Sequence, residues 1–396
     1  MTAPVVDTDV YALADAADPV RAAARVLRLV EGLAPSDVAG RAARVQERLD
    51  DAGCDALLVT NLVNVRWLTG FTGSAGLLLA TPDRLHLVTD GRYDFQSRDE
   101  LERAGVDAEI VIGAGEAQRD AIQARSSGFS RIGLESDSVT WAAQRRYASS
   151  WFEGAELVPT GRLVEDSRVV KDAGEIARIE AAAAIADAAL ARLRHRLVEE
   201  PREREFALEL DSEMRRLGAS GPSFDTICAA GTNGAMAHHR PDDTRLREGD
   251  LVVLDFGAVV DGYCSDMTRT VMLGEATSTQ ARMLEVVATS QQAGVAAVVA
   301  GVPAVDVDAA CREVIDQAGW GDAFSHGTGH GVGLEIHEAP GVSRTSAATL
   351  TPGAIVTVEP GVYLRDHGGV RIEDTLLVTP TGSRPLTLAP KVTAVS

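Results

Sequence analysis

The chain has 396 residues, of which 45% are hydrophobic and 24% charged, and its formal net charge is −20. Because this length exceeds what one ordinary hydrophobic core supports, we expect two domains. The negative charge argues against nucleic acid or an anionic membrane as a partner, since both would repel the protein.

Two further functional classes are disfavoured by the sequence. No apolar run reaches the length of about 18–20 residues that a membrane span needs, and the polar, acidic N-terminus is unlike a signal peptide. The cysteines lack the CxxC spacing of a thiolate metal site and suggest no disulfide framework. They are Cys54, Cys228, Cys264 and Cys311. We therefore expect a cytoplasmic protein.

Three segments follow one another along the chain. Residues 1–37 are alanine-rich and predict a helical extension without recognisable chemistry. Alternating strand and helix patterns over residues 38–165 predict an α/β domain. A polar segment then leads into a long amphipathic helix near 173–197, which places a domain boundary there. Residues 174–396 combine β patterns, glycine-containing turns and further helices, and predict an α+β domain. Those helices are expected near 202–217, 278–300 and 304–318.

Two aspartates interrupt the apolar strand pattern of residues 251–271. An Asp-Gly pair at 261–262 predicts a two-residue hairpin turn, which places Gly257 opposite Asp266. Asp255 and Asp266 then share one face as diagonal neighbours, about 7–8 Å apart. Two carboxylates this close repel each other unless a cation lies between them, and Gly257 would leave it space. Either aspartate alone would more simply be an exposed strand residue.

Three histidines occur in the segment 324–338, namely His326, His330 and His337. Alternate glycines between them disfavour a helix, at about 1 kcal/mol each, and indicate a strand or loop. A neutral imidazole is a good ligand for borderline divalent metals. A single histidine is more often a surface or core residue, but three in one glycine-rich segment favour a site.

Two glutamates occupy strand positions where a buried carboxylate needs a partner. Glu359 ends an apolar run, and Glu373 shares a strand face with Arg371 inside the segment 369–378. Either glutamate alone would also fit an exposed strand end. With the earlier candidates they supply four negative charges and one nitrogen, which balance two divalent cations. This oxygen-rich set favours Mn²⁺ or Co²⁺, while Zn²⁺ also fits. The candidate metal ligands are Asp255, Asp266, His330, Glu359 and Glu373.

The order of these motifs resembles the pita-bread metallopeptidases, and within them the proline-specific aminopeptidase P and Xaa-Pro dipeptidase (prolidase). The motifs are LDFG, SDMTRT, HGTGHGVG, TVEPG and RIEDT. The segments NVRWLTGFTGSAGLLL and TDGRY resemble the N-terminal domain of that family. The resemblance covers residues 38–396 and implies a creatinase-like α/β domain followed by an α+β pita-bread catalytic domain.

The resemblance also implies roles for individual residues. The five candidate ligands would hold two metal ions, and Glu359 would act as general base and then acid. His238 would line the substrate pocket, although His239 beside it is an alternative. His326 and His337 would hydrogen-bond the substrate and the reaction intermediate. Arg371 would support the residues around the pocket for the substrate's proline. Short proline-containing peptides are the implied substrates, and a homodimer or homotetramer is the implied assembly.

Several activities remain open at this stage. Aminopeptidase P accepts longer peptides, whereas a dipeptidase needs a cation for the substrate's C-terminal carboxylate. Arg344 is a candidate for that cation or a solvated loop residue. The GFTGSAG segment favours aminopeptidase P. Creatinase, which uses no metal, and a non-catalytic peptide-binding module are disfavoured because all five ligands are present.

Overall fold

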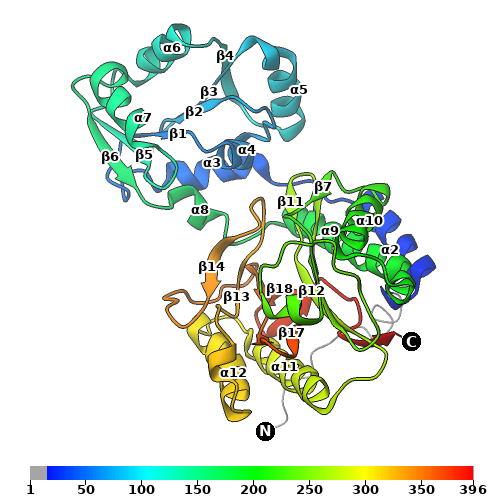
Figure 1. Ribbon diagram of the computed structural model, residues 1–396. Coiled ribbons are helices and arrows are strands. Elements are labelled where there is room, and N and C mark those ends of the chain that lie inside the picture. The colour runs from blue at the N-terminus through cyan, green and yellow to red at the C-terminus, as the bar shows by residue number, and fades with distance from the viewer. Residues whose placement is uncertain (1–15, 396) are drawn as a thin grey trace. The chain divides into compact units, whose positions relative to one another are not determined.

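The computed structural model describes residues 16–395, which divide into two compact units (Figure 1). Residues 35–168 form one unit, and residues 16–34 together with 169–395 form the other. The division between Arg168 and Val169 falls in the polar segment that precedes the long helix α9. None of the helices in the described part of the chain combines the length and apolar character of a membrane span.

The unit of residues 35–168 is a six-stranded mixed sheet with helices, which confirms the predicted α/β class. The strand order is β4-β3-β2-β1-β5-β6, and β2 runs antiparallel to both of its neighbours. The strands are β1 (Ala56–Val59), β2 (Leu77–Ala80), β3 (Leu85–Thr89), β4 (Ala108–Ile112), β5 (Arg131–Glu135) and β6 (Glu156–Thr160). The helices are α3 (Val38–Gln46), α4 (Leu62–Thr69), α5 (Asp94–Ala104), α6 (Glu116–Ser126), α7 (Trp141–Arg146) and α8 (Leu163–Ser167).

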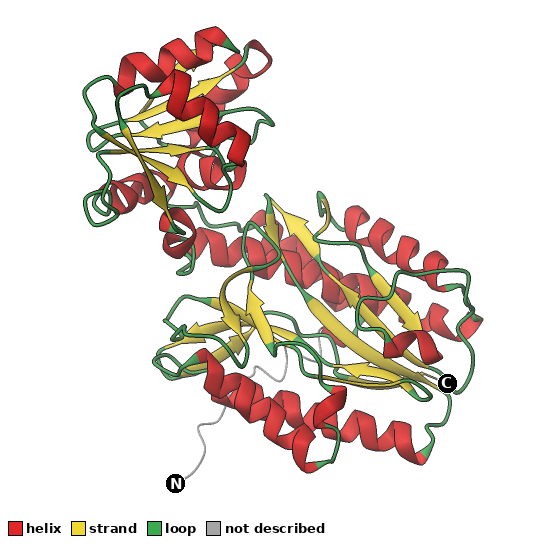
Figure 2. Cartoon of the chain, turned by 60° about the vertical axis from the view of Figure 1, so that its left-hand side comes forward, coloured by secondary structure: helices red, strands yellow, loops and turns green. Residues whose placement is uncertain are grey.

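The second unit contains two groups of helices with strands between them (Figure 2). Its helices are α2 (Pro19–Glu31), α9 (Ala173–Leu193), α10 (Glu203–Arg216), α11 (Ser278–Ala297) and α12 (Ala304–Gln317). Helix α9 begins at a capping box of Asp172 and Glu175, which satisfies backbone N–H groups at its first turn. Ala22 and Val26 of α2 are buried in one core with the alanines of α9. The described part of the N-terminal segment therefore packs into the second unit.

The strands of this unit form four sheets, which supply the frame of the site. The two larger sheets have the orders β20-β12-β9-β8 and β14-β13-β15-β18-β19, and the smaller ones β11-β10-β7 and β16-β17. Their bounds are β7 (Gly221–Pro222), β8 (Ile227–Ala230), β9 (Leu251–Phe256), β10 (Ala258–Val260), β11 (Tyr263–Cys264), β12 (Met267–Leu273), β13 (Gly329–Gly331), β14 (Glu338–Val342), β15 (Ile355–Val358), β16 (Gly361–Leu364), β17 (Gly368–Arg371), β18 (Asp374–Thr379), β19 (Gly382–Pro385) and β20 (Val392–Val395).

The predicted hairpin has the expected register. Val260 lies opposite Tyr263 where β10 pairs with β11, and in the same register Asp255 lies opposite Thr268 where β9 pairs with β12. Asp261 and Gly262 both have positive φ, 45° and 78°, as a two-residue turn of type I′ requires. The local turn thus fixes which side chains of β9 and β12 share a face.

Gly257 is required for a different reason from the predicted one. A Cβ atom at this position would lie 1.9 Å from the carbonyl oxygen of Ser265 and 2.3 Å from Oγ of Ser223. The expectation that this glycine clears space for an ion is therefore corrected. It lets the neighbouring backbone approach.

We expect Gly257→Ala to destabilise the protein by about 1–3 kcal/mol, because the new methyl group must displace backbone. Urea unfolding measures the change in the free energy of unfolding. Gly382→Ala is the matched control, since a Cβ atom there meets nothing within 4 Å. Equal stability of the two variants would contradict the crowding at Gly257.

The segment predicted as one strand over 369–378 is two strands. β17 ends at Arg371 and pairs with β16, whereas β18 begins at Asp374 and pairs with β15 and β19. The chain changes sheets at Ile372 and Glu373. Ile372 is buried in the hydrophobic core, and the Glu373 N–H donates to the carbonyl oxygen of Thr268 at 3.1 Å. The alternation of side chains is kept, but the strand is not continuous.

Candidate metal centre

The five predicted ligands come from separate elements and line one cavity of about 420 Å³. Asp255 lies near the end of β9, and Asp266 immediately precedes β12. His330 is the central residue of β13, Glu359 follows β15, and Glu373 lies between β17 and β18. Five segments spread over more than a hundred residues of sequence thus direct one side chain each into the same space.

His330 has the orientation that a metal ligand would need. Its Nδ1 is 3.0 Å from the carbonyl oxygen of Gly331, so this nitrogen carries the proton and donates. Its Nε2 is then left with a free lone pair, 3.5 Å from Oδ2 of Asp266 and 3.4 Å from Oε1 of Glu359. Ligand atoms of Asp266, His330 and Glu373 all lie within 4.8 Å of one another. A backbone carbonyl that fixes the imidazole tautomer is typical of metal-binding histidines.

Two carboxylate oxygens of the site are buried without a hydrogen-bond partner. They are Oδ1 of Asp255 and Oε1 of Glu373. An unsatisfied buried polar atom is costly, and native structures contain few of them. A cation in the cavity would satisfy both oxygens, so the donor set fits a metal centre.

The negative charge of the carboxylates in the cavity exceeds the positive charge of the protein groups around them. Burial, followed by repulsion from the neighbouring carboxylates, raises the pKa of Asp266 and of Glu373 well above the ordinary range. Burial is likewise the main cause that raises the pKa of Glu359 to about 8. Arg371 opposes these shifts as a single positive charge. Two divalent cations would supply the missing positive charge.

Two threonines that were not predicted hold two of the candidate ligands in place. Thr268 donates its hydroxyl to Oε2 of Glu373 at 2.7 Å, and Thr357 donates to Oε1 of Glu359 at 3.2 Å. Thr357 also accepts from the N–H of His330 at 3.1 Å. Each threonine is two positions from a ligand, Asp266 or Glu359, and two positions along a strand is the same face. That spacing is the signal by which they could have been found.

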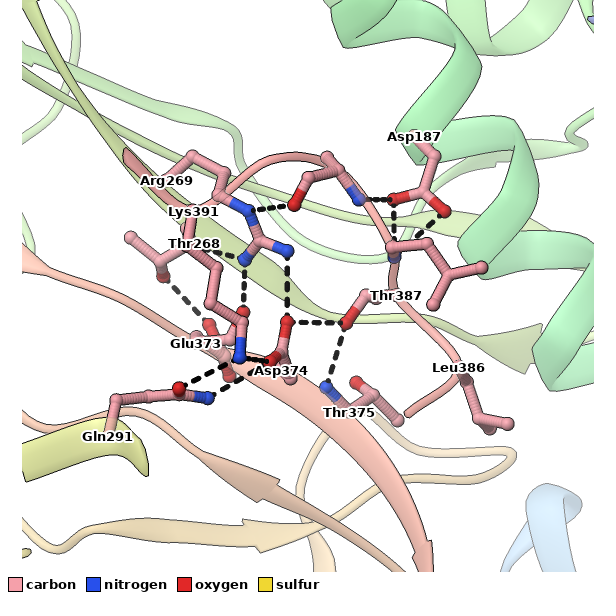
Figure 3. Close-up of polar contacts among 12 residues, drawn as sticks. Asp187, Thr268, Arg269, Gln291, Glu373, Asp374, Thr375, Leu386, Thr387 and Lys391 are labelled. Carbon is pink, nitrogen blue, oxygen red and sulfur yellow. Dashed lines mark hydrogen bonds and ion pairs between the residues drawn. The ribbon is translucent and has the colours of Figure 1, made fainter. Parts of the chain in front are cut away.

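A buried polar network holds the backbone behind Glu373 (Figure 3). Asp374 accepts from Arg269 at 2.9 Å, from Gln291 at 3.0 Å and from Lys391 at 2.6 Å. Arg269 also donates to the carbonyl oxygen of Glu373. Because Arg269 and Asp374 are almost completely buried, this ion pair is rigid and fixes the main chain that carries Glu373.

The last described segment of the chain is tied into the same network. Arg269 donates to the carbonyl oxygen of Ala389 at 2.9 Å. On α9, the buried carboxylate of Asp187 accepts from the N–H groups of Leu388 and Ala389 at 2.9 and 2.8 Å (Figure 3). Asp187 also pairs with Arg25 of α2 at 3.0 Å. The sequence offered no signal for these contacts, because their partners are far apart along the chain.

Comparison with known proteins points to a metal-dependent family, in agreement with the metal-binding geometry of the cavity. The sequence model of metallopeptidase family M24 matches residues 177–380, and that of the creatinase/prolidase N-terminal domain matches residues 41–170. The chain belongs to metallopeptidase family M24. It is therefore a metal-dependent peptidase, and the predicted resemblance to pita-bread metallopeptidases is confirmed.

Individual relatives extend over nearly the whole chain. An uncharacterized peptidase of Bacillus subtilis is 41% identical over 339 residues, which are 86% of this chain and 95% of the relative. Among solved structures, the Xaa-Pro dipeptidase from Bacillus anthracis is 38% identical with a TM-score of 0.86, over 90% of this chain and 100% of that one. The X-Pro aminopeptidase from Thermotoga maritima is 33% identical with a TM-score of 0.81, over 88% and 99%.

The predicted substrate residues of this M24 peptidase are divided between two cavities. His238, His326, His337 and Arg371 line the metal cavity together with the ligands. Arg344 instead lines a neighbouring cavity of about 370 Å³, which shares His326 with the first.

The histidines of the M24 cavity differ in how they are held. Both ring nitrogens of His326 are engaged, Nδ1 with the carbonyl oxygen of Gly327 at 2.7 Å and Nε2 with the hydroxyl of Tyr363 at 2.8 Å. Burial lowers the pKa of His326 to about 4, so its ring is neutral. The ring of His337 packs edge-on against His330, with centroids 4.3 Å apart. His326 thus belongs to the wall of the cavity, and Tyr363 is a site residue that the sequence did not reveal.

Proposed function

We propose that the protein is a dinuclear-metal exopeptidase that hydrolyses the bond between an N-terminal residue and a following proline. The observation that carries this proposal is the set of four carboxylates and one imidazole that line a single cavity. The names of the related Xaa-Pro dipeptidase and X-Pro aminopeptidase supply the proline preference. The free amine of a peptide would be attracted to the carboxylates of the cavity, which suits an exopeptidase.

The residues of the cavity suggest a division of labour. When bound, two divalent cations supply an activated water molecule and polarise the scissile carbonyl group. Glu359 is proposed to take the proton of that water and to return it to the leaving amine. His337 is proposed to donate a hydrogen bond to the developing oxyanion. His326, held by Tyr363, and His238 would orient the substrate.

Among the two proline-specific activities we favour that of aminopeptidase P. A dipeptidase needs a cation that reaches the C-terminal carboxylate of a bound dipeptide. Arg371 is already paired with Asp255 at 2.6 Å, and Arg344 lines the neighbouring cavity. Arg240 is the remaining arginine that lines the metal cavity, so the preference for longer peptides rests on the GFTGSAG segment of the sequence. The dipeptidase is kept as the alternative because the related structure from Bacillus anthracis carries that name.

A comparison of Ala-Pro-Ala with Ala-Pro, in Mn²⁺ and after EDTA, tests the proposal. We expect hydrolysis of the tripeptide at its Ala-Pro bond, a fall of more than about 100-fold with EDTA, and recovery with Mn²⁺. Ala-Ala-Ala is the control for proline preference. Hydrolysis of Ala-Pro alone would establish the dipeptidase instead. A metal-loaded protein inactive on every Xaa-Pro peptide would indicate the non-catalytic module.

We further infer that Mn²⁺ is the resident ion, because hard carboxylate oxygens dominate the ligand set. A cytoplasmic location is supported by the four cysteines, which are all buried and unpaired. The proposed assembly is a homodimer or homotetramer, and light scattering on the purified protein measures it.

A further inference from the structure

The first residue of α10, Glu203, carries a fully buried carboxylate whose hydrogen bonds all go to one loop. Its Oε1 accepts from the Ala230 N–H at 2.7 Å and from the Asn233 side chain at 3.0 Å. Its Oε2 lies 2.8 Å from Nε2 of His239 and accepts from the Asp242 N–H at 3.1 Å. The four partners fall within residues 230–242, from the last residue of β8 into its connection to β9.

This carboxylate is saturated. A carboxylate offers about four lone-pair positions, and all of them have a partner here. Ligand atoms of Glu203, His239 and Asp242 do lie within 4.8 Å of one another, as in a metal site. However, Glu203 has no acceptor position left for an ion. Its partners are main-chain and side-chain donors, which is the arrangement of an anchor for the loop.

The loop that Glu203 anchors forms one wall of the metal cavity. Residues 237–241, which include His238 and Arg240, line it. From the other side, Nη1 of Arg371 donates to the carbonyl oxygen of Ala237 at 3.2 Å. The wall is therefore held at two places, and the Glu203 anchor involves none of the five metal ligands.

We propose that Glu203 is a positioning residue that sets the substrate-binding wall of the cavity through residues 230–242. This inference rests on the proposed peptidase function for its kinetic consequence. Because the anchor acts on the wall and not on the ligands, its loss should weaken substrate binding and leave metal binding intact. We also expect kcat to stay the same, because the hydrogen bonds that hold Glu359 and Glu373 do not involve Glu203.

Glu203→Gln tests the proposal on the full-length, Mn²⁺-loaded protein with Ala-Pro-Ala as substrate. The glutamine side chain keeps the shape of the glutamate, but its NH₂ group faces hydrogen-bond donors and cannot accept from them. Hydrogen bonds to charged groups are among the stronger ones, so we expect KM to rise about tenfold or more. We expect kcat per metal-loaded subunit and Mn²⁺ content to stay unchanged. Glu203→Asp should recover part of the KM, because it restores the charge.

The matched control is Glu213→Gln on the same helix. Glu213 is also a buried carboxylate, but it pairs with Arg192 at 2.6 Å and Arg216 at 3.2 Å. We expect a loss of stability without a change in KM. If Glu203→Gln does not fold, Asn233→Ala removes only one of the four donors and should raise KM by a smaller factor in the same direction.

Hydrogen exchange separates the inference from the proposed function. We expect faster amide exchange over residues 230–242 in Glu203→Gln than in Glu213→Gln, whether or not the wild type cleaves Xaa-Pro peptides. Inactivity of the wild type would overturn the proposed function alone. An unchanged KM in an active Glu203→Gln variant, unchanged exchange, or a fall in its Mn²⁺ content would overturn the role of Glu203.

Discussion

Asp266→Asn is expected to lower both the metal content and the rate of peptide hydrolysis. Activity should fall by more than about 100-fold, because even residues that only support a metal ligand cost up to that factor when they are replaced. Asp266 is buried, its Oδ2 lies 3.5 Å from Nε2 of His330, and it shares the cavity with the three other carboxylates of the candidate ligand set. An asparagine keeps the shape but removes a charge that a divalent cation needs.

The same substitution should have the opposite effect on the stability of the metal-free protein. Without a cation, the carboxylate of Asp266 is disfavoured by burial and by repulsion from Glu373 and Asp255, which raises its pKa. Removing that charge is expected to stabilise the metal-free state by roughly 1 kcal/mol or more. Thermal unfolding in EDTA should therefore occur at a higher temperature in the variant, while Mn²⁺ should stabilise the variant less than the wild type.

Glu285→Gln makes the same change of charge at an exposed position on α11 and serves as control. It should keep the metal content, the activity and the response to EDTA. Metal content is measured on the purified protein by elemental analysis. An Asp266→Asn protein with undiminished metal would refute the assignment of this residue as a ligand.

Arg371→Met is expected to lower the stability of the protein more than Gly257→Ala does, and the size of the loss should depend on whether metal is bound. The guanidinium is almost completely buried and donates to Asp255 at 2.6 Å, to the Tyr363 hydroxyl at 2.8 Å and to Thr268 at 3.0 Å. Breaking a buried ion pair by removing one partner costs about 3–5 kcal/mol, because the other charge stays buried and unpaired. We expect a loss of this size for the protein in EDTA.

With Mn²⁺ present the loss should be smaller, because bound cations would compensate the charge of Asp255. Urea unfolding in EDTA and in Mn²⁺ measures the two free energies. Arg344→Met is the control for stability, since Arg344 is exposed and such substitutions usually change it by less than about 0.5 kcal/mol. An equal loss in both conditions would show that Arg371 does not balance the charge of the metal centre.

The sequence revealed those parts of the site that depend on short-range rules. The Asp-Gly turn specifies the register of β9 against β12, so the amino-acid sequence alone was enough to place Asp255 and Asp266 on one face. The glycines around His330 indicated a strand or loop for a similar local reason. The family motifs then brought Glu359 and Glu373 into the same site.

The parts that were missed depend on contacts between distant segments. Alternation continues through Ile372 and Glu373, so it does not reveal that the chain changes sheets between them. The partners of Asp374 lie about a hundred residues earlier and near the end of the chain, and no local pattern connects them. The requirement for Gly257 was likewise misread, because the backbone it accommodates comes from the opposite strand.

The position of Asp187 has a consequence for the biosynthesis of the protein. Its carboxylate joins Arg25 of the first described helix to the main chain at Leu388 and Ala389, near the other end of the described chain. Residues 35–168 form a compact unit of their own, and such units generally fold as they are synthesised. Helix α2 is synthesised earlier, but its link through Asp187 to the main chain at Leu388 and Ala389 forms only when those residues have been made. All five candidate metal ligands precede residue 388, so the growing chain supplies them before Asp187 can complete this junction.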